Sequence, residues 1–209
     1  MIDFYTWTTP NGRKVSILLE ELGVDYKAIP INIGQGEQMV PEFLEISPNN
    51  KIPAIYDHET GIALMESGAI MIYLAEKYGK FLPSDPMKKA KVIEWLMWQM
   101  GGLGPMLGQV HHFVHFNAGK AEYAEERYRN EAARLYRVLN DRLADRAFIC
   151  DEYSIADMAC WPWVSRYEWQ EINLDDYPNV KAWYQRLLAR KAVQEGYHVP
   201  KHMGEIPAG

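Results

Sequence analysis

The spacing of apolar residues changes several times along the first eighty residues of the chain. Residues 1–5 form a short apolar run with aromatic content, which predicts a buried strand. The next apolar residues recur at the spacing of one helical face, at Val15, Leu18, Leu19 and Leu22. Gly23 is expected to end that helix, because glycine is the commonest residue just after a helix. Residues 28–33 then alternate as in a strand, and Pro30 predicts that this strand lies at a sheet edge.

The following segment has the pattern of a hairpin and a helix. Residues 54–57 and 62–65 are typical of two short strands, and the loop residues 58–61 between them predict a hairpin turn. Residues 70–77 repeat at helical spacing up to Gly79. The predicted order is strand, helix, strand, irregular helix, strand, strand, helix. In this order a βαβ unit is followed by a ββα unit. The arrangement is that of a thioredoxin-like domain.

The second part of the chain has a different character. Residues 81–86 contain two prolines and a serine and are the best candidate for a linker. Beyond them no strand pattern appears, and a helical stripe is formed by Tyr128, Ala132, Leu135, Leu139 and Leu143. The sequence therefore predicts an α/β domain at residues 1–80, a linker at 81–86 and an all-α, all-helical domain at 87–209.

The composition and net charge of the chain exclude several classes of protein. The chain has 209 residues, of which 48% are hydrophobic, so it can bury a core. Its net charge is −6 and no basic tract occurs, which argues against nucleic acid as a partner. No apolar run is long enough to span a membrane, and no signal-peptide pattern is found. Two cysteines cannot form a disulfide framework, so we expect a cytoplasmic protein.

Residues 154–157, Ser-Ile-Ala-Asp, form the sharpest structural motif. A serine side chain that caps a helix, with an acidic residue three positions later that caps back, is a capping box. The apolar run that follows predicts a buried helix. We expect this motif to serve folding rather than chemistry.

The junction between Ile52 and Pro53 precedes a predicted strand. A trans bond is the ordinary case, since about 5–6% of X–Pro bonds in folded proteins are cis. A cis bond would turn the backbone N–H and C=O of Ile52 outward, where an extended peptide could pair with them as an added strand. The sequence leaves both states open.

Glu66 and Ser67 lie between a predicted strand and a predicted helix. Ser67 as a simple N-cap is the favoured interpretation. The alternative is a receptor for an amino-acid head group, in which the helix N-terminus binds the carboxylate and Glu66 binds the ammonium group.

Residues 9–14, Thr-Pro-Asn-Gly-Arg-Lys, open the first predicted helix. Asn11 is a candidate cap. Arg13 and Lys14 fall in the first turn, where the helix dipole disfavours cations. Either an anion binds nearby, or both side chains extend into water, and the sequence favours neither.

Histidines and cysteines complete the candidate chemistry. His111 and His115 share a helix face, but no further ligand is spaced with them, so a metal site is not predicted. The glycines between residues 101 and 108, together with Pro105, precede these histidines and are expected to kink or break the helix that carries them. Cys150 and Cys160 lie outside the first domain, which contains no cysteine, and Cys160 is expected to be buried and inert.

Taken together, the thioredoxin-like part, the Ile52–Pro53 junction, the turn at residues 66–70 and the box at 154–157 resemble a cytosolic glutathione transferase. The resemblance covers nearly the whole chain. The bacterial Nu class is the most similar, through residues 9–12, 46–55, 101–106 and 154–163.

The resemblance implies a glutathione site on the first domain and no metal. It implies catalytic roles for Thr9 and Asn11, which would stabilise a thiolate without accepting its proton. It implies that glutathione is bound by Asn11, Gln38, Lys51, Ile52, Glu66, Ser67 and Arg127.

The implied activity is glutathione-dependent disulfide-bond reduction, with glutathione as co-substrate and no protein cysteine. Glutathione or glutathione disulfide and a small-molecule disulfide or electrophile are the implied partners, without nucleic acid or membrane, in a homodimer. One alternative is conjugation of glutathione to electrophiles or reduction of organic peroxides. Another is a non-catalytic transferase-like interaction module.

Overall fold

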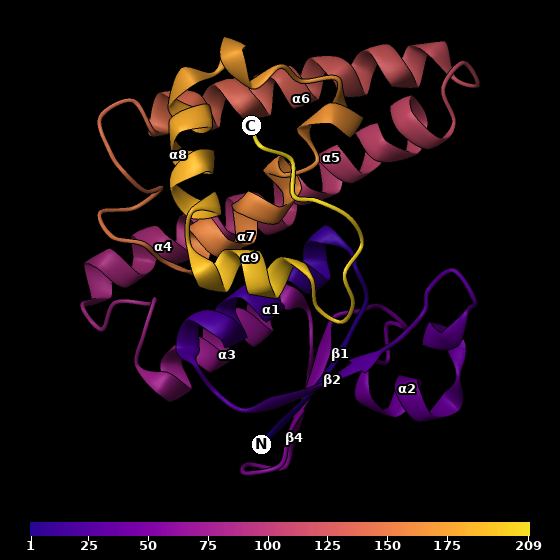
Figure 1. Cartoon of the computed structure of the whole chain (residues 1–209), viewed down its shortest axis with the longest axis vertical. Coiled ribbons are helices and arrows are strands. Elements are labelled where there is room, and N and C mark those ends of the chain that lie inside the picture. The colour runs from indigo at the N-terminus through magenta and orange to yellow at the C-terminus, as the bar shows by residue number, and fades with distance from the viewer. The chain divides into compact units, whose positions relative to one another are not determined.

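The computed structural model describes all residues, 1–209, and the chain divides into two compact units (Figure 1). The first unit contains Met1–Leu82 and Arg190–Ile206. The second unit contains Pro83–Ala189 and Pro207–Gly209. The thioredoxin-like fold predicted for the first part and the all-helical fold predicted for the second are confirmed.

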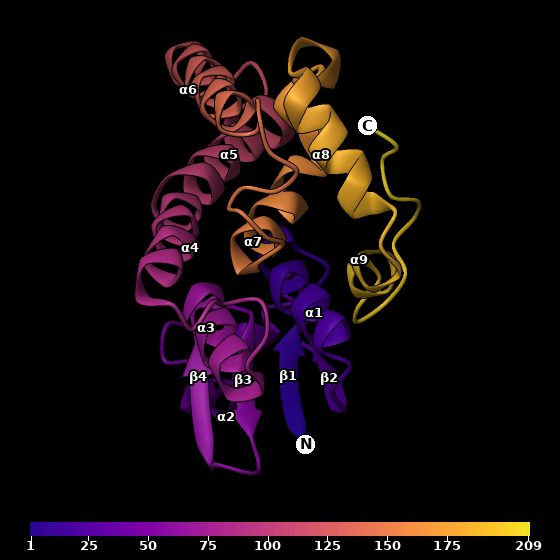
Figure 2. The ribbon, with the colours of Figure 1, turned by 90° about the vertical axis from the view of Figure 1, so that its left-hand side faces the viewer.

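A four-stranded sheet lies in the first unit, in the order β2-β1-β3-β4 (Figure 2). Its strands are β1 (Ile2–Thr6), β2 (Tyr26–Pro30), β3 (Ala54–Asp57) and β4 (Ile62–Met65). β1 and β2 are parallel, and the other two pairs are antiparallel. The hairpin prediction is confirmed, and so is the edge position of β2.

The predicted bounds of the second strand are wrong. The alternation predicts a strand over residues 28–33, but β2 ends at Pro30. The chain turns at Asn32, whose side-chain oxygen accepts the Gly34 N–H at 3.1 Å and whose own N–H donates to Glu37 at 2.6 Å. These local side-chain bonds replace the sheet ladder.

The helices of the first unit cover both faces of the sheet. The covering helices are α1 (Pro10–Leu22), α2 (Pro41–Ile46) and α3 (Ser67–Tyr78), with a 3₁₀ turn at Glu37–Met39, and the unit also contains α9 (Lys191–Tyr197). Gly23 and Gly79 end α1 and α3 as predicted. Phe4 of β1 is fully buried. Tyr5 alternates to the other face and packs its ring against Phe43 of α2, with centroids 6.0 Å apart.

Helix α9 packs along α1, although it follows the second unit in the sequence. A side chain at Gly196 would place its Cβ 2.7 Å from the backbone of Ile17, so only glycine permits this approach. The Ser16 hydroxyl donates to the Gly196 carbonyl at 2.6 Å, and Arg190 pairs with Glu21 at 2.6 Å. Residues 190–206 therefore differ from the prediction that all of 87–209 form one domain. The contact depends on Gly196 together with the buried Val193 and Tyr197, which are too few to form a helical stripe in the sequence.

The second unit consists of helices. They are α4 (Pro86–Trp98), α5 (Gly104–Val110), α6 (Glu122–Arg142), α7 (Ile155–Val164) and α8 (Pro178–Leu188), with π-helical turns at Gln99–Leu103 and His111–Phe116 and 3₁₀ turns at Tyr167–Gln170 and Leu174–Asp176. Of the kink or break expected from the glycines and Pro105, the break is wrong. The backbone stays helical from α4 to Phe116, because the π-turns absorb the irregularity.

The capping box at the start of α7 is confirmed. The Ser154 hydroxyl oxygen accepts the Ala156 N–H at 3.3 Å, and the Asp157 carboxylate accepts the Ser154 N–H at 3.1 Å. Asp157 also accepts bonds from the Ile149 N–H and the Trp183 ring N–H, each at 2.9 Å. Burial raises the pKa of Asp157 to about 6 despite these bonds. This carboxylate organises the fold.

Candidate functional site

The start of α1 presents a hydroxyl and an amide two positions apart in sequence, on Thr9 and Asn11. Thr9 is the N-cap, and its hydroxyl oxygen accepts the Gly12 N–H at 3.2 Å. The expectation that Asn11 caps this helix is wrong, because Pro10 occupies the first helical position and the cap is the residue before it. Asn11 is half-buried in the first turn. Since the Thr9 oxygen is an acceptor here, its hydroxyl hydrogen stays available as a donor.

Gly12 brings this turn against the end of β1. A Cβ atom at Gly12 would collide with the Thr6 hydroxyl and the Trp7 carbonyl. A glycine at this position therefore sets Thr9 and Asn11 directly above the carboxyl end of β1. In sheets of this kind, ligands bind beyond the carboxyl ends of the strands.

The start of α3 is a second polar position. The helix begins at Ser67, and Glu66 is the N-cap with φ 69° and ψ 111°. Ser67 as N-cap is therefore a wrong interpretation. A non-glycine residue at positive φ costs about 1–3 kcal/mol, and such strain clusters at binding sites. Glu66 is exposed and Ser67 is buried, so one charged group faces solvent beside the amide groups of the first turn.

Arg13 and Lys14 do not extend into water. Their side chains are 0% and 1% exposed, which excludes that alternative. Arg13 donates from Nε to the Tyr197 carbonyl at 3.0 Å, and its guanidinium lies 3.6 Å from the centroid of the Tyr197 ring. Lys14 donates from Nζ to the Ser67 hydroxyl oxygen at 3.3 Å.

The peptide bond between Ile52 and Pro53 is cis. Ile52 packs beside the cluster of Phe43 and Ala54, and β3 begins only at Ala54. No hydrogen bond from another part of the chain reaches the backbone N–H or C=O of Ile52. Both groups are available to an extended peptide.

The remaining predicted residues are spread over both units. Gln38 is half-buried in the 3₁₀ turn, and its side-chain oxygen is buried without a hydrogen bond. Lys51 is exposed, next to Ile52. Arg127 belongs to the second unit, where it is exposed on α6 and lines an open cavity of about 640 Å³. Its role stays a prediction.

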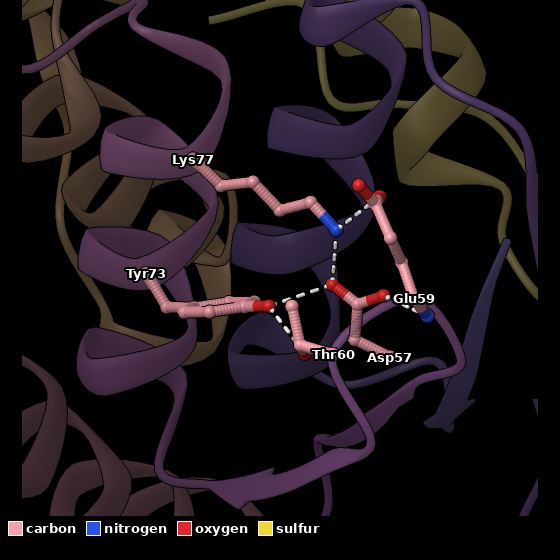
Figure 3. A network of polar contacts seen from close by, with 5 residues as sticks. All are labelled: Asp57, Glu59, Thr60, Tyr73 and Lys77. Carbon is pink, nitrogen blue, oxygen red and sulfur yellow. Dashed lines mark hydrogen bonds and ion pairs between the residues drawn. The ribbon is translucent and has the colours of Figure 1, made fainter.

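Sequence reasoning missed a polar network that links the β3–β4 turn to α3 (Figure 3). Asp57 is fully buried and accepts bonds from Lys77 at 2.5 Å, from the Tyr73 hydroxyl at 2.7 Å and from the Glu59 N–H at 3.0 Å. Burial acts to raise the pKa of Asp57, but the bonds from Lys77 and Tyr73 outweigh it and hold the pKa at about 2. The pKa of Lys77 is raised, because its bonds to Asp57 and Glu59 outweigh desolvation.

Histidines and cysteines do not build a reactive centre. His111 lies 3.0 Å from the Gln170 amide and stacks on Trp163, and burial lowers its pKa to about 4, so it is neutral. No three His, Cys, Asp or Glu residues are grouped as metal ligands. Cys150 and Cys160 are buried and form no disulfide. Burial raises the pKa of Cys150 to about 11, so its thiolate is scarce at neutral pH.

Comparison with known proteins decides the family. A model of the glutathione S-transferase N-terminal domain matches residues 4–84, and a model of the C-terminal domain matches residues 103–191. The chain belongs to the glutathione S-transferase family.

This glutathione S-transferase has close relatives. It is 52% identical over 198 residues to the disulfide-bond oxidoreductase YfcG of Escherichia coli, and the match covers 92% of each chain. A glutathione transferase from Pseudomonas putida, solved with one glutathione disulfide per subunit, has 44% identity and a TM-score of 0.90, over 95% of this chain and 91% of that one. A transferase from Burkholderia graminis, solved with two glutathione molecules per subunit, has 43% identity and a TM-score of 0.89, over 97% and 89%.

No helix of this glutathione S-transferase combines the length and the apolar character that a membrane span requires.

Proposed function

We propose that this glutathione S-transferase is a disulfide-bond reductase of the Nu-class type, which uses the thiolate of bound glutathione. The observation that carries the proposal is the contrast between the start of α1 and the surroundings of the two cysteines. Neutral donors, the Thr9 hydroxyl and the Asn11 amide, stand at the start of α1, while both cysteines are buried in the second unit. The reactive sulfur is therefore supplied by a ligand.

The glutathione backbone would lie along the first unit. The amides at the start of α3 and Ser67 would bind the carboxylate of the γ-glutamyl head, and Glu66 its ammonium group. The backbone N–H and C=O of Ile52 would pair with the cysteinyl residue as a short added strand. Gln38 and Lys51 would contact the rest of the tripeptide, and Arg127 stays a predicted ligand-binding residue.

Thr9 and Asn11 would stabilise the thiolate by hydrogen bonds. Neither side chain can take up a proton at neutral pH, so they act by lowering the pKa of the glutathione thiol. The N-terminal end of α1, where both stand, favours negative charge in the same direction. The chemistry rests on stabilising an anion rather than on a protein base.

The reaction takes two steps. The bound thiolate attacks one sulfur of a substrate disulfide, a glutathione mixed disulfide forms, and the other half leaves as a thiolate. A second glutathione thiolate then attacks the glutathione sulfur of the mixed disulfide and expels the remaining half. Two glutathiones become glutathione disulfide, and one substrate disulfide becomes two thiols, which take up the two protons.

Three relatives support this proposal. YfcG is named a disulfide-bond oxidoreductase, and the two solved transferases hold glutathione disulfide or two glutathiones in each subunit. A site that accepts both glutathiones is what the second step requires. The proposal also places the protein in the cytoplasm, where reduced glutathione is available, and makes it a homodimer.

The test is to assay three substrates side by side with glutathione: a small dialkyl disulfide, a chlorodinitrobenzene electrophile and an organic hydroperoxide. We expect faster turnover of the disulfide. Faster conjugation would instead support a transferase that modifies electrophiles, and faster reduction of an organic hydroperoxide would support a peroxidase. No turnover and no glutathione binding by calorimetry would leave a non-catalytic interaction module.

A further inference from the structure

The segment after α9 returns to the start of α1. Residues 198–206 belong to the same compact unit as β1 and α1. The ammonium group of Lys201 lies 4.3 Å from the centroid of the Trp7 ring, which is a cation–π contact. Trp7 directly follows β1, and its carbonyl accepts the Thr9 N–H at 2.7 Å. Lys201 therefore stands beside the loop that carries Thr9.

Contacts of the residues around Lys201 hold this segment in place. The Tyr197 carbonyl accepts a hydrogen bond from Arg13 at 3.0 Å. The rings of His198 and His202 stack on each other, with centroids 4.0 Å apart. Lys201 is itself exposed, but its backbone lies between these anchored neighbours. Its ammonium group is therefore held near Trp7 rather than free to sample a wide volume.

The charge of Lys201 is not neutralised within the protein. No carboxylate forms an ion pair with its ammonium group, and Glu205 is the one acidic residue of the segment 198–206. Residues 7–12, which form the loop and the first turn of α1, contain no charged side chain. Lys201 therefore supplies a positive charge to a surface that otherwise carries only neutral groups.

The proposed reaction gives this charge a use. The glutathione thiolate at the start of α1 would be anionic, so it repels a disulfide that itself carries carboxylates. A fixed cation nearby offsets that repulsion, and it opposes the approach of a disulfide that carries ammonium groups. The sign of the charge at Lys201 thus affects which disulfides reach the thiolate.

We propose that Lys201 is a specificity-determining residue, which favours small disulfides with carboxylate groups over small disulfides with ammonium groups. The inference rests on the proposed disulfide reduction, and it names the substrate class of that reaction.

Three small disulfides test the inference. Dithiodipropionate carries two carboxylates, cystamine carries two ammonium groups, and hydroxyethyl disulfide is uncharged. The measurement is kcat/KM for each disulfide at saturating glutathione, divided by the rate constant of its uncatalysed reaction with glutathione. This division removes the intrinsic reactivity of each disulfide. The quotient for dithiodipropionate over that for cystamine is the charge preference.

We expect the unaltered protein to favour dithiodipropionate. Lys201→Met keeps an apolar stem against Trp7 and removes the charge, so it should lower the charge preference about threefold, as for loss of an exposed charge interaction. Lys201→Glu reverses the charge and should lower it about tenfold, whereas Lys201→Arg should retain it. Turnover of hydroxyethyl disulfide should change little. Added salt should reduce the charge preference of the unaltered protein.

Lys191→Met is the matched control. It removes an exposed lysine at the start of α9, in the same C-terminal part of the chain but away from Trp7. Its charge preference should equal that of the unaltered protein.

A charge preference that neither Lys201→Met nor Lys201→Glu changes would overturn the inference. Equal loss of turnover with all three disulfides would overturn it too, because it would mean a purely structural role. An unaltered protein that reduces all three disulfides without a charge preference would remove the inference alone. An unaltered protein that reduces none of them would remove the proposed function and this inference with it.

Discussion

Thr9 and Asn11 are adjacent to the same helix start, but the fold uses them differently. The Thr9 oxygen is needed to cap α1, whereas the Asn11 side chain is not the cap. Substitution of Thr9 would therefore change folding and chemistry together. Asn11 is the residue at which the proposed role in thiolate stabilisation can be tested more cleanly.

Asn11→Ala is expected to lower disulfide reduction about tenfold or more, because a lost donor to a charged group costs about 1.5–3 kcal/mol. The measurement is kcat/KM for a small disulfide at saturating glutathione, together with the pH dependence of the rate. The apparent pKa of the bound thiol should rise. Gln109→Ala, which removes an exposed amide from α5, is the control. Unchanged turnover of Asn11→Ala would exclude Asn11 from the mechanism.

Glu66→Ala is expected to weaken glutathione binding more than it slows the chemical step. Its carboxylate is exposed at the start of α3 and would pair with the ligand ammonium group. Calorimetric titration with glutathione measures the effect, and Glu45→Ala on the exposed side of α2 serves as control. Identical affinities for the variant and the unaltered protein would refute the assignment of Glu66.

At the scale of elements, the Asp57 network connects the β3–β4 turn to the last turns of α3. Removing one partner of a buried ion pair typically costs about 3–5 kcal/mol. Lys77 would keep Glu59 as a second partner at 2.8 Å, so the lower end of that range applies. The proposed site for the γ-glutamyl head lies at the other end of α3. The Asp57 network therefore stabilises the helix on which glutathione binding would depend.

Asp57→Asn is therefore expected to lower the free energy of unfolding by about 3 kcal/mol at neutral pH. The Asp57 pKa of about 2 lies below the unfolded value of about 3.9, so its contribution is full at higher pH. It is lost as the pH falls through about 4 toward 2. Urea unfolding of both proteins between pH 6 and pH 3 should show the difference shrinking with acid, and a constant or growing difference would contradict it.

The order of elements could be predicted from the sequence because its signals are local. Gly23 and Gly79 mark helix ends, and the residues 154–157 form a capping box within a single turn. Contacts between residues that are far apart in the chain produce no comparable local motif in the sequence. The pairing of Asp57 with Lys77 spans twenty positions, and the burial of Lys14 against Ser67 spans fifty-three.

The candidate site was predicted by resemblance more than by pattern. Hydrogen-bonding side chains at a helix start suit a cap and a ligand equally well, so the sequence alone favours Ser67 and Asn11 as caps. The cap positions follow from Pro10 and from the positive φ of Glu66. A backbone angle of this kind is set by tertiary structure and cannot be derived from residue type.

At the scale of the whole molecule, the placement of the cysteines separates the proposed chemistry from that of a dithiol enzyme. Replacing Cys150 and Cys160 together by alanine should leave glutathione-dependent disulfide reduction within about twofold, because both thiols are buried in the second unit and changes of this kind act mainly on packing. Thermal unfolding of the double variant controls for stability. Loss of turnover in a folded double variant would mean that a protein thiol takes part.

The seating of α9 on α1 also has a consequence for biosynthesis. Residues 190–206 complete the unit that residues 1–82 begin, and the whole of 83–189 is translated between them. A nascent chain therefore cannot bury Arg13 beneath Tyr197 until the helical segment has already left the ribosome. The unit that contains the N-terminus therefore completes its packing only after the helical segment has been synthesised.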